Sequence, residues 1–393
     1  MRAIVTKERA AVSLLFLMNG TMAGCWAVKV PQFSSALSLS EFELGLMILT
    51  LGLGSIVFMP IAGASISRFG SRAVALATSL MFVPMLLVLT LAPNVMTAVP
   101  AIFLFGGFMG AMDVAMNANA VETETHMGRA IMSSCHAFWS LGGLAGAGLG
   151  GWLLTISTPI LHALVSTFLA AALLLLAWPY LYRDAPHHHS DHTPRSGLPR
   201  TAAPWLLGII ALFSMIPEGS VLDWSALYLR KELHTDVAAS GLAYAGFSLT
   251  MALMRFAGDH LRDRLGAILI LRLSAAIAMS GLLLAGFAAG PLMAIAGFAL
   301  MGIGIANLVP IAFSAAGKLP GLAPGIGLSV VTTMGYCGIL IAPSLIGFIA
   351  SHASLGLVFK ALPVLLVVVL LLSGQARHAD RQDEDRHAVD IEA

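Results

Sequence analysis

Among the ionisable side chains within the long apolar stretches of this sequence, six are singled out as lying well inside them. They are Lys29, Asp113, His136, Glu218, Asp223 and Arg255. If those stretches cross a lipid bilayer, each side chain is costly to bury there, and such residues typically mark the path of a solute or a proton. Binding of a polar solute and reversible protonation are therefore the chemistry that these residues predict.

Helical spacing places several of these residues on stripes with other polar or aromatic side chains. Asn19, Trp26 and Lys29 recur at intervals that keep them on one face of a helix, as do Asp113 and Asn117. The indole of Trp26 has a shape that stacks on a sugar or an aromatic ligand. The full set of predicted solute-binding residues is Asn19, Trp26, Lys29, Asp113, Asn117, His136, Glu218, Asp223, Tyr244, Asn307 and Tyr336.

Lys29 and Glu218 fall at a similar depth when the rise along a helix is counted as about 1.5 Å per residue. One hypothesis is that they form a pair in the outer half of the protein that breaks or binds solute during transport. The alternative is a permanent structural pair.

Asp113, His136 and Glu218 are the predicted proton carriers. A carboxyl group among apolar side chains can exchange a proton near physiological pH, and an imidazole titrates there without any perturbation. The alternative is that Asp113 stays ionised beside His136, or serves only as a hydrogen-bond acceptor for neighbouring helices.

Composition identifies the elements that must position these residues. Of the 393 residues, 58% are hydrophobic and only 10% are charged, whereas a soluble domain carries about 25% charged residues. These values exclude a soluble enzyme and a disordered chain. The formal net charge of +1 gives no basic excess for a nucleic acid to bind. The sequence also lacks a catalytic triad, a nucleotide loop and a metal cluster, so we expect neither enzymatic activity nor a cofactor.

The apolar stretches are long enough for helices that span a membrane, each of which needs about 20 residues. We predict twelve spans, and the sequence places them near 11–33, 44–66, 73–92, 97–120, 131–155, 159–182, 204–226, 237–257, 266–288, 291–317, 325–349 and 355–374. The glycine run 142–151 predicts close helix packing. Pro310 and Pro343 predict kinks within the tenth and eleventh spans.

Basic residues set the orientation. With the N-terminus inside, the inner segments hold fifteen Lys and Arg residues, against only Arg230 and Lys231 in the outer loops. We therefore expect both termini in the cytoplasm. The polar segment 183–203 divides the spans six and six, and its His187, His188, His189 and His192 are read as part of a soluble linker rather than a metal site.

The two sets of six spans resemble each other at a constant offset of 196 residues, as from Gly70 to Gly266. The stretch GASISRFGSR (63–72) matches DHLRDRLGA (259–267) at this offset, with Arg68 on Arg264. Internal duplication of this kind is typical of secondary transporters. It predicts four parts: a six-helix bundle over 1–182, a linker over 183–203, a second bundle over 204–374 and a disordered tail over 375–393.

The loop G-x-x-x-S-R-F-G-S-R resembles the G-x-x-x-D-R-x-G-R-[KR] loop of the major facilitator superfamily. Ser67 replaces the usual aspartate of the first copy, whereas Asp263 keeps it in the second, which puts in doubt the charge lock ascribed to the first copy. The residues predicted to act in gating are Arg68, Arg72, Arg255, Asp263 and Arg264.

Several longer stretches resemble the YbjJ-type inner-membrane proteins, a branch related to sugar-type permeases. Among them are CWAVKVP (25–31), MDVAMNANAVE (112–122) and MSSCHAFWSLGGLAGAG (132–148). The resemblance implies an all-α membrane protein of twelve transmembrane helices in two pseudo-symmetric bundles, with the first, fourth, seventh and tenth spans lining a central cavity.

We therefore expect a monomeric secondary active transporter in the bacterial inner membrane. It is expected to move a small polar solute, sugar-like or another metabolite, by alternating access coupled to protons. The alternatives are a drug or metabolite exporter working as a proton antiporter, a lipid flippase, and a sensor that binds solute without transporting it. The expected partners are the small-molecule substrate, protons and the lipid bilayer, and not nucleic acid.

Overall fold

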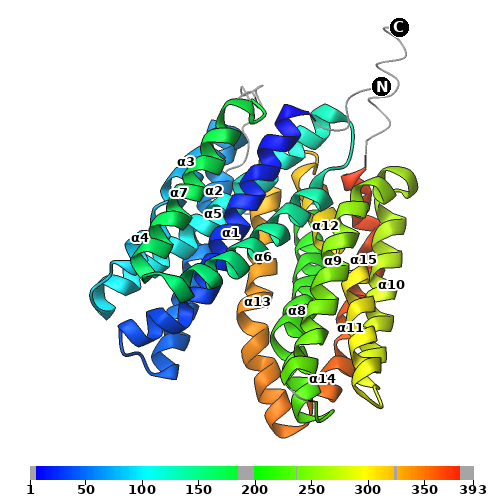
Figure 1. Ribbon diagram of the computed structural model, residues 1–393. Coiled ribbons are helices and arrows are strands. Elements are labelled where there is room, and N and C mark those ends of the chain that lie inside the picture. Colours follow the sequence, from blue (N-terminus) through cyan, green and yellow to red (C-terminus); the bar gives the residue numbers. More distant parts are fainter. Residues whose placement is uncertain (1–5, 185–198, 236, 323–324, 381–393) are drawn as a thin grey trace, which may run out of the picture. The chain divides into compact units, whose positions relative to one another are not determined.

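The computed structural model describes residues 6–184, 199–235, 237–322 and 325–380, and within these ranges all regular structure is helical (Figure 1). The four linker histidines and most of the predicted tail lie outside the described residues. All twelve predicted spans fall on helices, so the predicted all-helical fold is confirmed.

The chain divides into two compact units that follow the duplication. Unit 1 comprises Met1–His126, Cys135–Leu198 and Gly321–Ser329, and unit 2 comprises Met127–Ser134, Pro199–Pro320 and Val330–Ala393. Each unit thus includes one short segment from the other half of the sequence. These two segments contain the first residues of a helix that continues in the other unit.

The helices of unit 1 correspond to the first six spans. They are α1 (Lys7–Ala36), α2 (Glu41–Phe69), α3 (Ser71–Phe82), α4 (Met85–Thr90), α5 (Val95–Met127), α6 (Met132–Ile156), α7 (Pro159–Ala177) and the short 3-10 helix η1 (Trp178–Tyr180). Side-chain caps begin several of them: the Thr6 hydroxyl accepts from the Arg9 amide, and Ser40 and Glu43 form a capping box. The third span is split into α3 and α4 at Pro84, whose ring removes a backbone donor.

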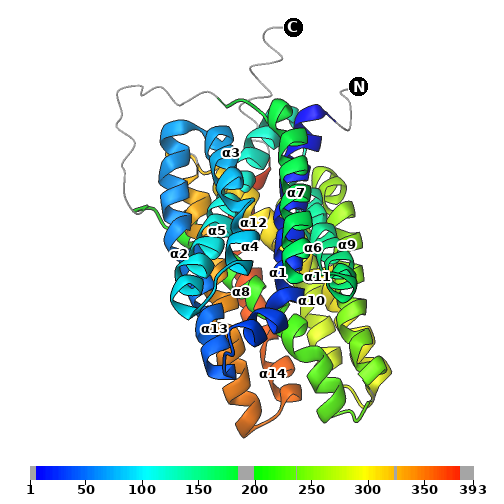
Figure 2. The same ribbon diagram turned by 60° about the vertical axis from the view of Figure 1, so that its left-hand side comes forward.

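The helices of unit 2 correspond to the last six spans. They are α8 (Ala203–Lys231), α9 (Val237–Leu265), α10 (Ala267–Gly286), α11 (Pro291–Ile305), α12 (Leu308–Gly317), α13 (Ile326–His352), α14 (Leu355–Ala361), α15 (Pro363–Leu372) and the 3-10 helix η2 (Ser373–Ala379). α11 packs along both α9 and α10, and these helices run side by side in Figures 1 and 2.

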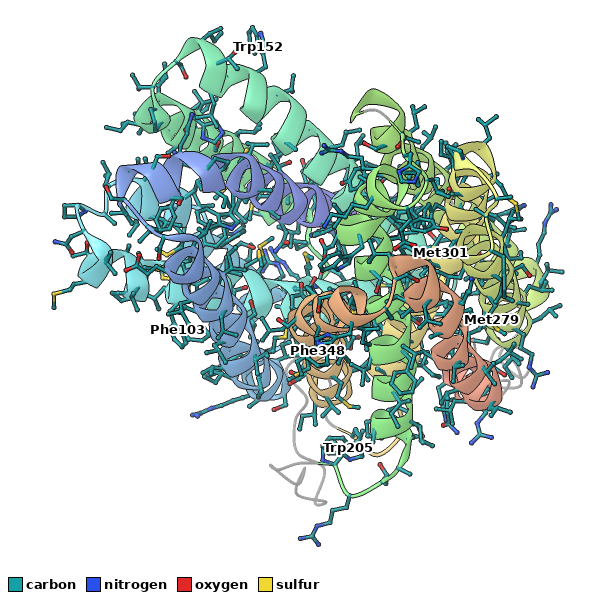
Figure 3. The ribbon with its side chains drawn as sticks, turned by 90° about the horizontal axis from the view of Figure 1, so that it is seen from below. Phe103, Trp152, Trp205, Met279, Met301 and Phe348 are labelled. Atoms are coloured by element: carbon teal, nitrogen blue, oxygen red, sulfur yellow. The ribbon has the colours of Figure 1, made fainter. Side chains whose placement is uncertain are left out.

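Eleven helices or helix pairs of the described residues are long and apolar enough to cross a membrane. The eighth predicted span, α9, is not among them, and its last third carries charged residues between Arg255 and Arg264. Large apolar side chains face outward on both units: Trp152 of α6 is 62% exposed and Phe348 of α13 is 64% exposed, whereas Met301 of α11 is fully buried (Figure 3). Lipid is the solvent that suits such a surface.

Glycines bring α1 and α6 into close contact, as the sequence predicted. A Cβ atom at Gly142 would lie 2.2 Å from the Leu17 carbonyl oxygen, and one at Gly20 would lie 2.0 Å from the Trp139 carbonyl oxygen. Neither distance is compatible with a side chain larger than hydrogen. Small residues therefore set the spacing of these helices.

The same turn precedes α3 in unit 1 and α10 in unit 2. Gly70 and Gly266 cap these helices with φ angles of 82° and 81°, a region open to glycine. An aspartate from the end of each half then accepts from the first helical amides: Asp184 from Ser71 and Arg72, and Asp380 from Ala267. Asp184 and Asp380 are themselves 196 residues apart, so the duplication extends to this cap.

The first residues of the predicted disordered tail are ordered. Helical structure continues through η2 to Ala379, and Ser373, Ala376 and Ala379 are buried. The carbonyl oxygen of Ala379 accepts from Arg262 and, at 2.8 Å, from the Lys318 ammonium. These contacts fix the position of residues that were predicted to be a solvated terminus because their sequence is charged.

Candidate functional site

A layer of amide and indole groups joins three helices of unit 1. The Trp139 indole N–H on α6 donates to the Asn19 Oδ1 on α1 at 2.9 Å, and the Asn19 Nδ2 donates to the Met109 carbonyl oxygen on α5 at 3.3 Å. Asn19 is 1% exposed. Asn19 was predicted to lie among polar residues inside the bundle, and it has one hydrogen-bond partner on α6 and another on α5.

A second polar layer lies one helical turn away on the same helices. His136 Nε2 lies 3.2 Å from Asn117 Oδ1, and Asn117 Nδ2 lies 3.3 Å from Asp113 Oδ1. The Phe16 ring meets the His136 imidazole edge-on, with their centroids 5.2 Å apart. Histidine, amide and carboxyl thus form a continuous chain of hydrogen bonds, in which the Asn117 amide separates the two titratable groups.

Trp26 does not lie in either polar layer. Its ring packs against Phe33 and Phe105, with centroids 5.3 and 5.7 Å away, and Phe105 in turn packs against Phe82. The predicted stacking role of Trp26 is therefore replaced by an aromatic core. The spacing that put Trp26 on the stripe of Asn19 was correct for the helix, but it did not show that aromatic side chains surround this end of the stripe.

Lys29 is buried near the far end of α1, where its ammonium donates to the Pro159 carbonyl oxygen at 2.6 Å. Pro159 opens α7 of the same unit. Lys29 therefore has a backbone partner in unit 1.

An ion pair of unit 2 lies against a break in a helix. The tenth span is interrupted between α11 and α12 at Ala306 and Asn307, since Pro310 has no N–H to donate to the Ala306 carbonyl oxygen four residues earlier. Arg255 of α9 takes the place of that donor, with its Nε 3.4 Å from the Ala306 oxygen. Its Nη2 pairs with Glu218 Oε1 on α8 at 3.0 Å.

Both members of the pair lie inside helices. Arg255 was grouped with the gating residues, and it lies inside α9, within the predicted eighth span; Glu218 lies near the middle of α8. The depth of Glu218 in the membrane stays a prediction. Arg255 is 3% exposed and the Glu218 side chain 17%, so the pair is mostly removed from solvent.

Asn307 lies at the break itself and is fully buried. Both polar atoms of its side chain lack a hydrogen-bond partner. A Cβ at Gly258 would lie 1.9 Å from Asn307 Oδ1, so only glycine allows α9 to approach the amide this closely. Unpaired polar atoms inside a broken membrane helix are typical of binding sites in transporters.

The remaining predicted binding residues stand apart from these groups. Asp223 and Tyr244 are exposed on α8 and α9, and Tyr336 is partly buried on α13. No contact recorded for the described residues brings Asp223 or Tyr244 to the Glu218–Arg255 pair.

The predicted gating residues fall into two groups. Arg68 and Arg264 are exposed, whereas the Arg72 guanidinium donates to the Trp178 carbonyl oxygen at 3.2 Å. Asp263 binds the segment of unit 2 that precedes α6: it accepts from the Ala130 amide at 2.8 Å and lies 3.8 Å from Arg129 Nε.

Two further residues of chemical interest escaped the sequence analysis. Asp259, one turn before Asp263, accepts from the amides of Ser133 and Ser134 at 2.8 and 2.9 Å. His162 is fully buried in α7 with both ring nitrogens unpaired. Both had a signal in the sequence, because Asp259 is part of the repeated loop and His162 lies inside the predicted sixth span.

Helices long enough to span a membrane, a duplicated frame and buried polar groups around a broken helix together define a multi-pass membrane transporter. Comparison with known proteins gives the family. A sequence model of the Major Facilitator Superfamily matches residues 12–321 and 207–388. The chain therefore belongs to the major facilitator superfamily, and it is a secondary transporter rather than an enzyme.

Relatives along the whole chain agree with this assignment. An uncharacterised transporter of Sinorhizobium fredii, y4wD, is 36% identical over 95% of this chain and 99% of its own length. Membrane protein MosC of Rhizobium meliloti is 34% identical over 94% of this chain and 90% of its own. The more specific resemblance to the YbjJ-type proteins stays a prediction.

Solved structures share the fold at low sequence identity. The E. coli fucose:proton symporter FucP superposes with a TM-score of 0.78 at 18% identity, over 95% of this chain and 98% of its own. The proton:xylose symporter XylE gives a TM-score of 0.76 at 12% identity, over 94% of this chain and 95% of its own.

Proposed function

We propose that the protein couples the movement of a small, uncharged polar solute, such as a sugar, to the movement of protons by alternating access. The observation that carries this proposal is the buried Glu218–Arg255 pair beside the broken helix of unit 2. An ion pair at this depth costs more to desolvate than an apolar pair of the same size, so stability alone does not account for it. A role in transport accounts for the ion pair if the pair breaks when a proton binds and forms again when the proton is released.

Protonation of Glu218 is the proposed coupling event. A proton on the Glu218 carboxylate removes the charge that Arg255 faces, while Arg255 keeps its hydrogen bond to the Ala306 oxygen. The guanidinium and the break at Asn307 can then move together, away from α8. Loss of the proton restores the pair, so Glu218 binds and releases one proton in each cycle.

The polar layers of unit 1 supply the proposed solute contacts and a second proton carrier. Asn19, Trp139 and Asn117 are neutral hydrogen-bonding groups that are paired within unit 1 in this structure, and the exchange of these bonds for bonds to hydroxyl groups would suit a polar, uncharged solute better than a charged or lipophilic one. Asp113 and His136 stand at the two ends of the Asn117 amide, and each is proposed to bind and release a proton by itself, since the amide between them passes none. The proton-coupled sugar symport named for FucP and XylE supports this choice of solute class.

Residence in a bacterial inner membrane with both termini in the cytoplasm, as a monomer, is part of the same proposal. The distribution of basic residues supports the orientation, and the bacterial relatives support the location.

Transport by purified protein in liposomes tests the proposal. A thermal-shift screen of neutral monosaccharides and other small polar solutes identifies a substrate, and its uptake is then measured with and without an imposed pH gradient. We expect uptake driven by the gradient in the wild type, and none in Glu218→Gln. Glu43→Gln is the matched control, since Glu43 is exposed and glutamine also serves in its capping box. Uptake in the wild type that ignores the pH gradient would refute proton coupling.

A further inference from the structure

A buried cluster near the far end of α1 is not used by the proposed mechanism. It lies wholly within unit 1 and comprises Cys25 and Lys29 of α1, Gly150 of α6, and His162 and Ser166 of α7. Lys29 is 3% exposed and His162 is 0% exposed. α1 and α7 pack side by side, as Figure 2 shows.

His162 has no protein partner for either of its ring nitrogens. An imidazole buried in this way loses its hydrogen bonds to water, at a cost of about 1–3 kcal/mol for each polar atom left unsatisfied. A leucine or phenylalanine at this position would avoid that cost. The presence of histidine therefore indicates a partner that is not part of the chain.

Lys29 has unused donors beside this histidine. Its ammonium carries three N–H groups, and its recorded hydrogen bond is the one to the Pro159 oxygen. Within the described part of unit 1, no carboxylate pairs with Lys29. Its ammonium binds the oxygen of Pro159, which lies one helical turn before His162 on the same helix, so the two groups lie in the same region of α7.

The backbone of α6 packs closely against His162 at a glycine. A Cβ added at Gly150 would lie 3.0 Å from His162 Nε2 and 3.3 Å from Cys25 Sγ. Glycine therefore keeps a side chain away from the ring nitrogen. Cys25 is already engaged, because its Sγ donates to the Gly146 carbonyl oxygen and accepts from the Ser166 hydroxyl.

We propose that Lys29 and His162 bind a small anionic group, either a free anion or the carboxylate of a small molecule. The ammonium supplies the opposite charge that a buried anion needs, and a neutral imidazole donates its Nε2–H to the same group. A metal ion does not fit this site, because the Lys29 charge repels a cation and the cysteine is hydrogen-bonded elsewhere. The site is separate from the Glu218–Arg255 pair and does not depend on proton coupling.

Thermal unfolding of the purified full-length protein with defined anions tests the proposal. Sodium chloride, sodium acetate and a panel of small hydroxy- and amino-carboxylates are titrated at constant ionic strength, with a bulky sulfonate as the balancing anion. We expect a saturable rise in Tm. A response to chloride and acetate identifies a free anion as the ligand, and a response restricted to larger carboxylates identifies a small molecule.

The second half of the chain provides the matched variant. Ser225 and Val358 occupy the positions that correspond to Lys29 and His162 at the offset of 196 residues. Lys29→Ser/His162→Val is therefore expected to fold and to bind the anion about tenfold or more weakly. His162→Gln keeps a donor and is expected to retain most of the response.

Two results would overturn the anion site. One is a wild type whose Tm responds to none of these anions more than to the sulfonate. The other is a double variant that responds as the wild type does. Because the measurement involves no transport, either result leaves the proposed transport function to its own test.

Discussion

The two copies of the loop that follows the second helix of each half share a frame and differ in charge. Gly70 and Gly266 adopt the same left-handed conformation, and Asp184 and Asp380 cap the helices that follow. These features satisfy backbone amides that would otherwise be unpaired at a helix start. Both halves need them to fold, so both halves have kept them.

The two copies of the loop differ in the residues that contact the start of a neighbouring helix. In unit 2, Asp259 and Asp263 accept from the amides of Ser133, Ser134 and Ala130. The corresponding positions in unit 1 are Gly63 and Ser67, and a Cβ at Gly63 would lie 2.5 Å from the Ser329 Cβ. One copy is thus held by charged hydrogen bonds and the other by close packing.

The interior of the two halves shows the same divergence. Met22 and Met59 stand where Glu218 and Arg255 stand in the second half, and both methionines are fully buried. The duplicated fold therefore tolerates an apolar pair at these positions. This agrees with the role in coupling that we propose for the ion pair of unit 2.

The largest effect is expected from replacing the ion pair. Glu218→Met leaves the buried Arg255 charge without its carboxylate, at a cost of about 3 kcal/mol in the free energy of unfolding. Glu218→Met/Arg255→Met gives unit 2 the residues of unit 1 and is expected to recover most of that stability. Proton-driven uptake is expected to be absent in both. Thermal unfolding and liposome uptake measure the two effects, and a double variant that still follows the pH gradient would remove the pair from coupling.

The next effect concerns the aspartates of the second loop. Asp259→Gly/Asp263→Ser copies unit 1 into unit 2 and removes hydrogen bonds to a charged group worth about 1.5–3 kcal/mol each. Amide hydrogen exchange at Ala130, Ser133 and Ser134 is therefore expected to speed up by about 10-fold to 100-fold. The amides of Ser71 and Arg72, held by Asp184, serve as internal controls. Unchanged exchange at all three sites would show that packing, not charge, protects this segment.

The fold could be predicted from the sequence because its signals are local. Apolar stretches mark the spans, the glycine run marks close packing of α1 and α6, and Pro310 marks the break between α11 and α12. The helix ends were missed, since polar turns such as those of α9 continue a helix without adding hydropathy, and so was the split of the third span at Pro84.

The pairing of side chains could not be predicted in the same way. Spacing shows which face of a helix a residue occupies, but it does not show which neighbour that face meets. Glu218 was assigned to Lys29 on the basis of depth, whereas in the structure it pairs with Arg255 and Lys29 binds the Pro159 oxygen. A backbone carbonyl as the partner of a buried charge has no signature in the sequence.

Removal of either capping aspartate is expected to cause a smaller loss of stability, and the loss is expected to differ between the two halves. Asp184→Ala is expected to cost about 1 kcal/mol, as for loss of a helix cap. Asp380→Ala is expected to cost more, because Asp380 also lies 3.6 Å from the buried Arg262, for which unit 1 has Ile66. Melting temperatures of the two variants test this order. Equal shifts would mean that the Arg262 contact adds nothing to the cap.

The smallest effect distinguishes the two glycines that begin α3 and α10. Alanine at either position adopts a left-handed conformation, at a cost of about 1 kcal/mol. A Cβ at Gly70 would lie 3.1 Å from Asp184 Oδ2, whereas at Gly266 it would lie 3.4 Å from Asp380 Oδ2. Gly70→Ala must therefore displace the carboxylate slightly, and its Tm is expected to fall below that of Gly266→Ala. Combining Gly70→Ala with Asp184→Ala removes the crowded carboxylate oxygen. The double variant is therefore expected to lose less stability than the sum of the losses in the two single variants. Full additivity would show that the backbone conformation alone requires glycine in both copies.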